Sequence, residues 1–383
     1  MSPATRDNAR YLRRQRCEDD AKKTGGRTQP LAVTAGSGIQ DVSSSLARAE
    51  ICVGSEQVET LGGNYPRRMS LAEYEDLLHV LPLSSIEYAF AYGSGALQQQ
   101  GENKADKMVD FILSTNDPVQ FHAENIKKNP SHYSLLRYVG PKPLANFQTR
   151  IAARVYYNTH VWVGKRQMKY GVVATEDLNR DLLDWRWLYV SGRLHKPVLD
   201  TNVEENRRCA LQAALLLLPD SFTLEDLYQK IVSLSYSGDF RMYVGEDKDK
   251  VKKIVRGSME ELSNVYDPFL ANDSKLVVQN KSVLQDGSTA AIYHRLNLLP
   301  STVLKRIQKN WNKRNKWQKD TEEVLFSLAH RHDVSLHVEG AIAAIVAPAA
   351  MSQSLKNAAS AGVSRTVLYS LAKLTKMFKS MAK

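Results

Sequence analysis

The sequence predicts an α+β protein built in three successive parts, and three observations support this. Residues 66–200 alternate strand-like and helix-like segments around a glycine–serine turn. Residues 201–320 are mostly helix-like with one hairpin, a pattern that suits a winged-helix-like domain. Residues 321–383 keep a helical pattern to the end and predict a C-terminal helical region.

The elements of the first part are marked by alternation and by helix-capping residues. Strands are expected at 86–92, 108–113, 154–163 and 166–174, the last two forming a hairpin around Gly164-Lys165. Three helix starts are predicted from capping signals: Ser70 with Glu73, Asp117 with Pro118, and Thr175.

The second part is predicted to contain helices at 202–218 and 223–234 and another after Gly245. Thr223, with Asp226 three residues later, caps the second of these helices. Residues 276–292 alternate in character, and we expect a hairpin that turns at Asp286-Gly287.

The N-terminal segment 1–65 is rich in Ser, Gly, Arg and Gln, shows no periodicity, and is predicted to be a disordered extension. Its arginine-rich start is typical of a mitochondrial presequence, whereas the acidic run Glu18-Asp19-Asp20 argues against one. Both readings stay open.

Composition narrows the class of protein. The chain has 383 residues, 43% of them hydrophobic and 24% charged, as in ordinary globular proteins. Three scattered cysteines exclude a disulfide framework and a CxxC metal site. No run approaches the roughly 18–20 apolar residues of a spanning helix, so an integral membrane protein is not expected. The net charge of +11 favours an anionic partner.

The glycine–serine turn carries the strongest chemical signal. Gly93-Ser94-Gly95 follows a strand, and Asp110 lies on the next one. Bare backbone N–H groups and a hydroxyl can cradle phosphates, and a nearby carboxylate can hold Mg²⁺ against them. This is the arrangement of the nucleotidyltransferase fold of polymerase β-type enzymes. An ordinary turn beside a structural aspartate is the alternative, and no second acidic residue stands at 108 or 112.

Longer strings resemble one family, the mitochondrial phosphatidate cytidylyltransferases, also called mitochondrial CDP-diacylglycerol synthases or the translocator maintenance protein family. The strings that carry this resemblance include Tyr92-Gly93-Ser94-Gly95, Val109-Asp110-Phe111-Ile112, Asn129-Pro130-Ser131-His132-Tyr133-Ser134, Lys169-Tyr170-Gly171-Val172-Val173, Gly192-Arg193-Leu194 and Leu234-Ser235-Tyr236-Ser237-Gly238-Asp239-Phe240-Arg241-Met242. The resemblance covers about residues 85–356. It departs at Pro348-Ala349-Ala350, where the family usually has Pro-Ser-Ser.

The resemblance implies a function in lipid synthesis. The family makes CDP-diacylglycerol and pyrophosphate from CTP and phosphatidic acid with Mg²⁺, feeding phosphatidylglycerol and cardiolipin synthesis. It works peripherally on the matrix face of the mitochondrial inner membrane. The implied fold is a nucleotidyltransferase domain, a winged-helix-like domain and a C-terminal membrane-binding helical region. No nucleic-acid partner is expected.

The reaction suggests a role for each candidate residue. We expect Gly93 and Ser94 to bind the triphosphate, Asp110 to bind Mg²⁺, and Lys169 to contact a phosphate. The alternative for Lys169 is a solvent-facing strand lysine.

Two further pairs follow in the chain. Arg193 and Lys196 form a plausible anion clamp, with plain surface charge as the alternative. Asp181 and Asp184 are explained by helix capping or ion pairing about as well as by metal binding.

Two more pairs complete the predicted site. Asp239 is expected to be a second metal ligand or base and Arg241 a phosphate contact; an Asp–Arg pair that ties two helices together is the alternative. His132 and Tyr133 are expected to contact the base or ribose, with a packed or helix-capping histidine as the alternative.

The C-terminal region is basic. Residues 305–319 hold seven basic residues and no acidic ones around Trp311 and Trp317, which fits either RNA or anionic lipid. Further on, Leu368, Leu371, Leu374, Phe378 and Met381 recur at helical spacing opposite basic residues. This predicts an amphipathic helix on an anionic membrane surface, with packing on the protein's own core as the alternative.

Two other functions compete with the lipid enzyme. A nucleotidyltransferase acting on RNA would use the basic tail for the phosphate backbone. A non-enzymatic assembly factor for mitochondrial import would not need Asp110.

Overall fold

The computed structural model describes residues 50–51, 71–93, 108–198, 203–243, 246–247 and 249–361. All of them belong to one unit, Ala47–Lys383. The predicted extension 1–65 lies outside the described residues except for the short strand β1, Glu50–Ile51. Ser70, Ser94, Gly95, Gly245 and the predicted amphipathic helix at 368–381 also lie outside them.

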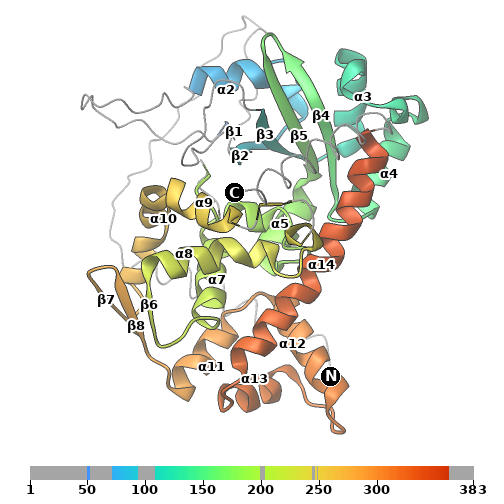
Figure 1. Ribbon diagram of the computed structural model, residues 1–383. Coiled ribbons are helices and arrows are strands. Elements are labelled where there is room, and N and C mark those ends of the chain that lie inside the picture. Colours follow the sequence, from blue (N-terminus) through green and yellow to red (C-terminus); the bar gives the residue numbers. More distant parts are fainter. Residues whose placement is uncertain are drawn as a thin grey trace, which may run out of the picture. The chain divides into compact units, whose positions relative to one another are not determined.

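A five-stranded mixed sheet forms the first part, in the order β1-β2-β3-β5-β4 (Figure 1). Strands β2 (Tyr88–Tyr92) and β3 (Val109–Thr115) are antiparallel, β3 and β5 (Arg166–Ala174) are parallel, and β4 (Val155–Val163) is antiparallel to β5. The predicted strands and the β4–β5 hairpin are confirmed.

The two faces of this sheet pack on different helices because side chains alternate along each strand. Phe111 and Tyr170 point toward α2 (Leu71–Leu78) and α3 (Pro118–Lys128). Phe90 and Ile112 point toward α5 (Thr175–Asp184) and α6 (Ser191–Leu194).

The capping signals gave mixed results. Asp117 caps α3 as predicted, accepting hydrogen bonds from the backbone of Val119 and Gln120. The prediction for Thr175 was wrong by one residue, because Ala174 occupies the N-cap and no side chain caps α5.

The second part is mainly helical around a large apolar core. Its elements are α7 (Glu204–Leu215), β6 (Ser221–Thr223), α8 (Leu224–Ser233), the 3-10 turns η4 (Leu234–Tyr236) and η5 (Phe240–Met242), α9 (Lys250–Gly257), α10 (Met259–Ala271), β7 (Leu276–Gln279), β8 (Ser282–Gln285), α11 (Thr289–Asn297), α12 (Ser301–Arg314) and α13 (Thr321–Ala329). The predicted capping box of Thr223 and Asp226 is confirmed at the start of α8.

The hairpin of this part turns earlier than predicted. Strands β7 and β8 are joined at Asn280 and Lys281, both with positive φ, and Asn tolerates that conformation well. Asp286-Gly287 instead leads from β8 into α11, which Ser288 caps. The predicted turn at Asp286-Gly287 was therefore wrong.

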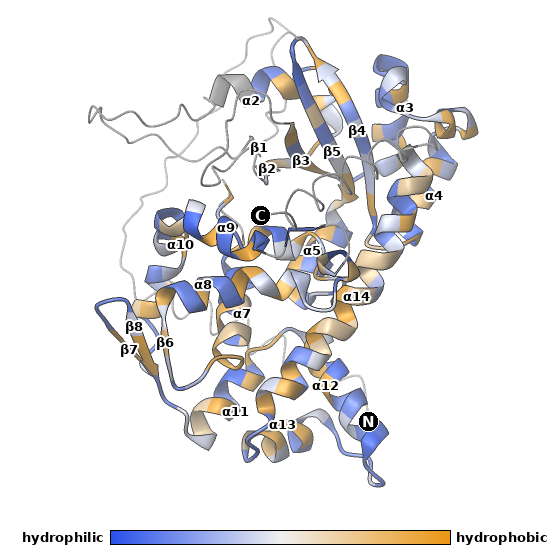
Figure 2. Cartoon of the chain, viewed as in Figure 1, coloured by the Kyte–Doolittle hydropathy of each residue, from blue (hydrophilic) through white to orange (hydrophobic). Residues whose placement is uncertain are grey.

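The helix α14, Val334–Ala361, was not expected at this length. By length and composition it is the one described helix that could cross a membrane, which corrects the statement that no such run exists. It also packs inside the protein, against α12 at one end and β4 at the other (Figure 1). Figure 2 shows its largely apolar colouring, and Ile342, Ile345 and Val346 are buried in the core of the second part.

Candidate active site

A row of three side chains crosses the sheet beside the glycine–serine turn. Strand register places Tyr92, Asp110 and Lys169 next to one another on β2, β3 and β5. The Lys169 ammonium lies 2.9 Å from the Asp110 carboxylate, and each side chain is 22% exposed. A carboxylate and its counter-charge thus stand together, reachable from solvent.

Gly93 brings the turn against this carboxylate. Its φ is +78°, and a Cβ at this position would lie 3.3 Å from Asp110 Oδ2. Glycine adopts this left-handed conformation without steric cost. The predicted partner Ser94 lies outside the described residues, so its role stays a prediction.

The segment after α5 is fixed by Asp181. Its carboxylate accepts hydrogen bonds from the backbone N–H groups of five successive residues, 187–191, at 2.8–3.1 Å. Asp181 therefore has a structural role, although it is not an N-cap residue: α6 begins after Val190 without a side-chain cap. Asp184 accepts a hydrogen bond from Ser301. Because Asp181 orders the start of α6, it positions Tyr189 and Arg193.

Arg193 points back toward the sheet from α6. Its guanidinium lies 4.0 Å from the ring centre of Tyr189 and 5.2 Å from that of Tyr92, and it donates a hydrogen bond to the Tyr189 carbonyl. Next to it, a Cβ on Gly192 would lie 2.3 Å from Ser235 Cβ. Glycine thus lets α6 approach η4 closely, so that residues of the second part reach this site.

Tyr236 on η4 lies between two lysines. Lys196 Nζ and Lys250 Nζ are 5.1 and 5.2 Å from its ring centre. Burial alone would raise the pKa of Tyr236, but the charges of Lys196, Lys250 and Arg193 outweigh it and lower the pKa to about 8. Burial, opposed by Tyr236, lowers the pKa of Lys196 as well. These two pKa shifts indicate that positive charge exceeds negative charge around Tyr236, at a position that is partly shielded from solvent.

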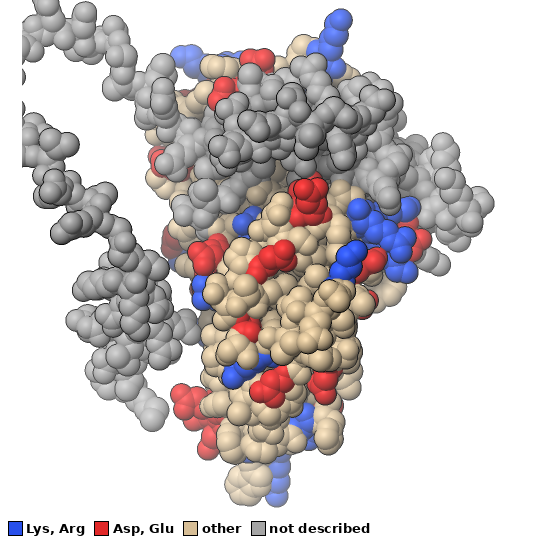
Figure 3. Space-filling view, turned by 90° about the vertical axis from the view of Figure 1, so that its left-hand side faces the viewer, with Lys and Arg blue, Asp and Glu red and all other residues tan. Residues whose placement is uncertain are grey.

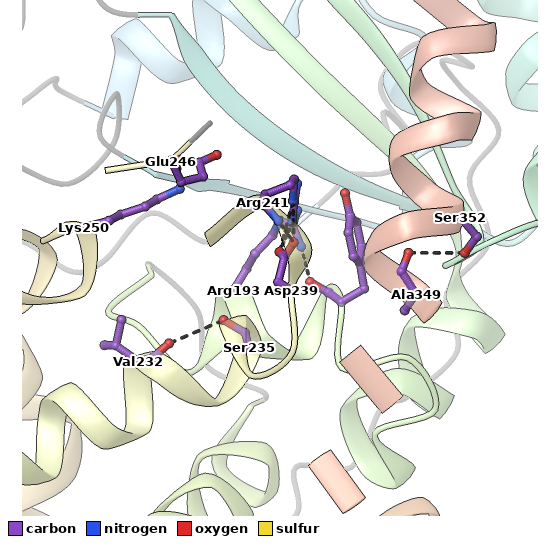
Figure 4. Close-up of polar contacts among 10 residues, drawn as sticks. Arg193, Val232, Ser235, Asp239, Arg241, Glu246, Lys250, Ala349 and Ser352 are labelled. Carbon is purple, nitrogen blue, oxygen red and sulfur yellow. Dashed lines mark hydrogen bonds and ion pairs between the residues drawn. The ribbon is translucent and has the colours of Figure 1, made fainter. Parts of the chain in front are cut away.

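Arg241 is held by Asp239. The Asp239 carboxylate is 1% exposed and accepts hydrogen bonds from the Arg241 backbone N–H and, at 2.6–3.0 Å, from its guanidinium. The described hydrogen bonds of this carboxylate all come from Arg241, so an Asp–Arg pair is favoured over a metal ligand or base. The pair lies within η5 and does not tie two helices together, as the alternative had supposed. Figure 4 shows Arg241 and Arg193 converging, with Lys250 and Glu246 to one side.

These residues form one basic cluster, defined here as Lys169, Arg193, Lys196, Arg241 and Lys250. Despite burial, the charges of Arg193, Arg241 and Lys169 lower the pKa of Tyr189, and the guanidinium of Arg193 lies 4.0 Å from the centre of its ring. The three carboxylates of Asp110, Asp239 and Glu246 pair with Lys169, Arg241 and Lys250. Five cations against three carboxylates make the cluster suitable for a polyanion.

Lys250 was not among the predicted site residues. Its only sequence signal is its place at the start of a helix, four residues after Glu246, with which it pairs at 2.7 Å. Such spacing is common on helix surfaces and does not by itself indicate a site.

His132 and Tyr133 lie on the opposite face of the sheet. His132 Nδ1 is 2.9 Å from the Tyr170 hydroxyl, and Asn125 donates to the hydroxyls of both Tyr133 and Tyr170. Tyr170 follows Lys169 on β5 and therefore points to the other side. The structure does not bring His132 and Tyr133 to Asp110, and it favours the packed-histidine alternative.

One carboxylate of the site remains suited to a metal. Within the described ranges, no three His, Cys, Asp or Glu side chains gather as ligands. Mg²⁺ commonly binds through one or two carboxylates, with water and substrate phosphates completing its shell. Asp110, beside a turn and a basic cluster, fits an ion held jointly with phosphate oxygens.

Comparison with known proteins gives a consistent result. The profile of a family described as mitochondrial phosphatidate cytidylyltransferase matches residues 74–376. Proteins of that name from Caenorhabditis briggsae, Xenopus laevis and Homo sapiens are 61%, 41% and 40% identical to this chain. These alignments cover 80%, 81% and 73% of this chain and 99%, 95% and 65% of the relatives. The chain therefore belongs to the mitochondrial phosphatidate cytidylyltransferase family.

Proposed function

We propose that this protein transfers the cytidylyl group of CTP to phosphatidic acid, producing CDP-diacylglycerol and pyrophosphate. The names of its relatives support this reaction, and they do not favour an RNA nucleotidyltransferase or a non-enzymatic import factor. In this proposal the product feeds phosphatidylglycerol and cardiolipin synthesis on the matrix side of the mitochondrial inner membrane.

The observation that carries the proposal is the convergence of Gly93 and Asp110 with the basic cluster. An oxygen of the phosphatidate phosphate attacks the α-phosphorus of CTP and forms a new P–O bond. The bond from the α-phosphorus to the oxygen that bridges it to the β-phosphorus breaks, and that oxygen leaves with pyrophosphate. Negative charge grows on the departing pyrophosphate. Fixed cations from two parts of the chain stabilise that charge and hold the triphosphate for in-line attack. Phosphatidate is already ionised, so the step needs no strong base.

Magnesium would be held by Asp110 together with the phosphates of the nucleotide. When bound, the ion would neutralise phosphate charge and make the α-phosphorus more electrophilic. Lys169 holds the Asp110 carboxylate in place through their ion pair. Arg193 and Arg241 would contact the phosphates, and Asp239 would keep the guanidinium of Arg241 oriented.

The proposal extends to the fold and to the membrane. We assign the β1-β2-β3-β5-β4 sheet with α3 and α5 to a nucleotidyltransferase-like domain, supported by the turn at Gly93 and the carboxylate on β3. The β6-β8-β7 sheet with its helices is our candidate for the winged-helix-like domain. The amphipathic pattern at 368–381 supports a helix that binds an anionic membrane surface.

The test is CDP-diacylglycerol formation from CTP and phosphatidic acid in anionic liposomes with Mg²⁺. We expect product from the wild type and a loss of at least about a hundredfold in Asp110→Asn. Asp117→Asn is the matched control, because asparagine also caps a helix and activity should persist. No product from folded, liposome-bound wild type would refute the proposal.

A further inference from the structure

The short turn η3, Leu135–Val139, presents apolar side chains to solvent. Leu135, Tyr138 and Val139 are 80%, 73% and 51% exposed. Leu136 points inward and packs on a buried cluster around Leu144. The turn is therefore anchored from below, and its exposed apolar residues are held outward by a fixed backbone.

The backbone of the turn is fixed by local hydrogen bonds. The Ser134 hydroxyl accepts from the Leu136 N–H, and the Ser134 carbonyl accepts from the Arg137 N–H. Three large apolar side chains within five residues form a patch rather than isolated surface residues, and such patches mark interaction sites.

Arg137 lies within this turn, beside its exposed apolar side chains. The Arg137 guanidinium lies 4.7 Å from the Tyr138 ring centre and donates to the Tyr138 hydroxyl and the Pro130 carbonyl. Residues 117–150 include five basic side chains: Lys127, Lys128, Arg137, Lys142 and Arg150. The exposed apolar turn with Arg137 beside it, in a stretch that has five basic and two acidic residues, matches the layered chemistry of an anionic bilayer, whose surface is negative and whose interior is apolar.

The same stretch holds two acidic residues, Asp117 and Glu124. Asp117 accepts two backbone hydrogen bonds at the start of α3, and Glu124 accepts hydrogen bonds from Ser85 and Gln120, so both carboxylates are held in place and remain charged. Five basic side chains against these two acidic ones leave the stretch with net positive charge.

The end of α14 contacts the end of α4 (Pro141–Arg150) that lies away from this turn. Lys356, near the end of α14, donates to the carbonyls of Gln148 and Ile151, where α4 ends (Figure 1). The sequence after Ala361 contains the apolar and basic pattern of residues 368–381. On a different side of the molecule, where α10 and β7 lie, Figure 3 shows acidic and basic side chains interspersed.

We propose that Leu135, Tyr138 and Val139 insert into an anionic bilayer and form a membrane contact separate from the C-terminal helix. The inference rests on the proposed function, because phosphatidate is a bilayer lipid that the enzyme must reach. Apolar side chains enter the acyl boundary while Arg137 and Lys142 remain at the headgroups.

The experiment compares the full chain with the triple variant Leu135→Ser, Tyr138→Ser, Val139→Ser. Binding is measured by sedimentation with phosphatidylcholine vesicles that contain phosphatidylglycerol. We expect the apparent vesicle affinity to fall at least about tenfold, since each CH₂ removed from the bilayer lowers binding. The matched control, Val277→Ser with Leu284→Ser, changes side chains that are 51% and 50% exposed on the β7–β8 hairpin. It should bind like the wild type.

Activity on a short-chain, water-soluble phosphatidate separates docking from catalysis. We expect the triple variant to keep wild-type activity on it. A wild type inactive on this substrate would count against the proposed function, while the vesicle result would still decide the docking surface. Unchanged vesicle binding by the triple variant would overturn the inference.

A second measurement does not depend on the triple variant folding. The chain has five native tryptophans, so quenching by brominated lipids is measured as the difference between each variant and the wild type. We expect added quenching in Tyr138→Trp and none in Val277→Trp. No added quenching in Tyr138→Trp would overturn the inference.

Discussion

Lys356 allows the packing of α14 to be tested by pH. Its ammonium is buried, and burial first, then the charge of Arg154, lowers its pKa from 10.5 to about 7, against an opposing effect of Asp177. The neutral amine keeps two N–H groups, enough for the carbonyls of Gln148 and Ile151. Deprotonation therefore removes the desolvation penalty without breaking these contacts.

The sign and size of the effect follow from linkage. Between pH 7 and 10.5 the unfolded chain holds a proton on Lys356 that the folded protein has released, so the free energy of unfolding rises with pH. The free-energy cost of burying the charged ammonium is fully present below pH 7 and disappears as pH approaches 10.5. With these two pKa values, the wild type gains about 2 kcal/mol from pH 7 to pH 9 through this side chain.

The assay is urea unfolding at pH 7, 8 and 9 of the wild type, Lys356→Met and Lys356→Arg. All other titrating groups are the same in the three proteins, so differences in how their free energies of unfolding change with pH report on residue 356 alone. We expect the wild type to gain about 2 kcal/mol relative to each variant, because methionine never ionises and arginine stays charged. The same slope in all three proteins would refute the reasoning.

Two further predictions concern the basic cluster. Asp239→Asn should lower kcat/KM for CTP about tenfold to a hundredfold, because an asparagine side chain has one acceptor oxygen where the carboxylate offers two to the Arg241 guanidinium. In the Arg241→Met background, Asp239→Asn should cause little further loss of kcat/KM. An additive loss in the double variant would instead indicate a direct role for Asp239. The affinity for CTP, measured by isothermal titration calorimetry, should fall as pH rises through about 8, because the Tyr236 phenolate then cancels part of the positive charge of the basic cluster. The Tyr236→Phe variant, which has no hydroxyl to ionise, should not show this fall. A fall of the same size in Tyr236→Phe would assign the titration to another group.

The sequence predicted correctly those elements whose structure depends on residues close together in the chain. Strand alternation predicted β2 to β5, and the side chains of Thr223 and Asp226 form their capping box within four residues. The hairpin turn was misplaced because Asn280-Lys281 lacks the glycine that usually marks such a turn, whereas Asp286-Gly287 has it. A helical pattern was predicted over 321–383, but the length and apolar character of α14 were not, because polar residues such as Gln353 and Lys356 interrupt its apolar run.

Those interruptions have tertiary causes. Gln353 donates to the Val155 carbonyl and accepts from the Ala153 N–H, and Lys356 binds the end of α4. No periodicity along α14 could reveal partners two hundred residues earlier in the chain. The same holds for His132 and Tyr133, whose place on the far face of the sheet depends on the register of Tyr170.

By itself the sequence determined the family, the strands that carry Asp110 and Lys169, and the glycine that lets the turn reach the carboxylate. The strands and the glycine follow from residues that are neighbours in the chain, and the family follows from the short sequence motifs. Only the tertiary structure decided that Asp239 serves Arg241, that Asp181 orders the backbone before α6, and that Lys250 joins the cluster. The physical reason is that charge effects and hydrogen bonds depend on the geometry of the folded chain. Folding brings Lys196 and Lys250 from separate segments to Tyr236, and it selects the local backbone conformation in which Asp239 reaches Arg241 and Asp181 reaches residues 187–191.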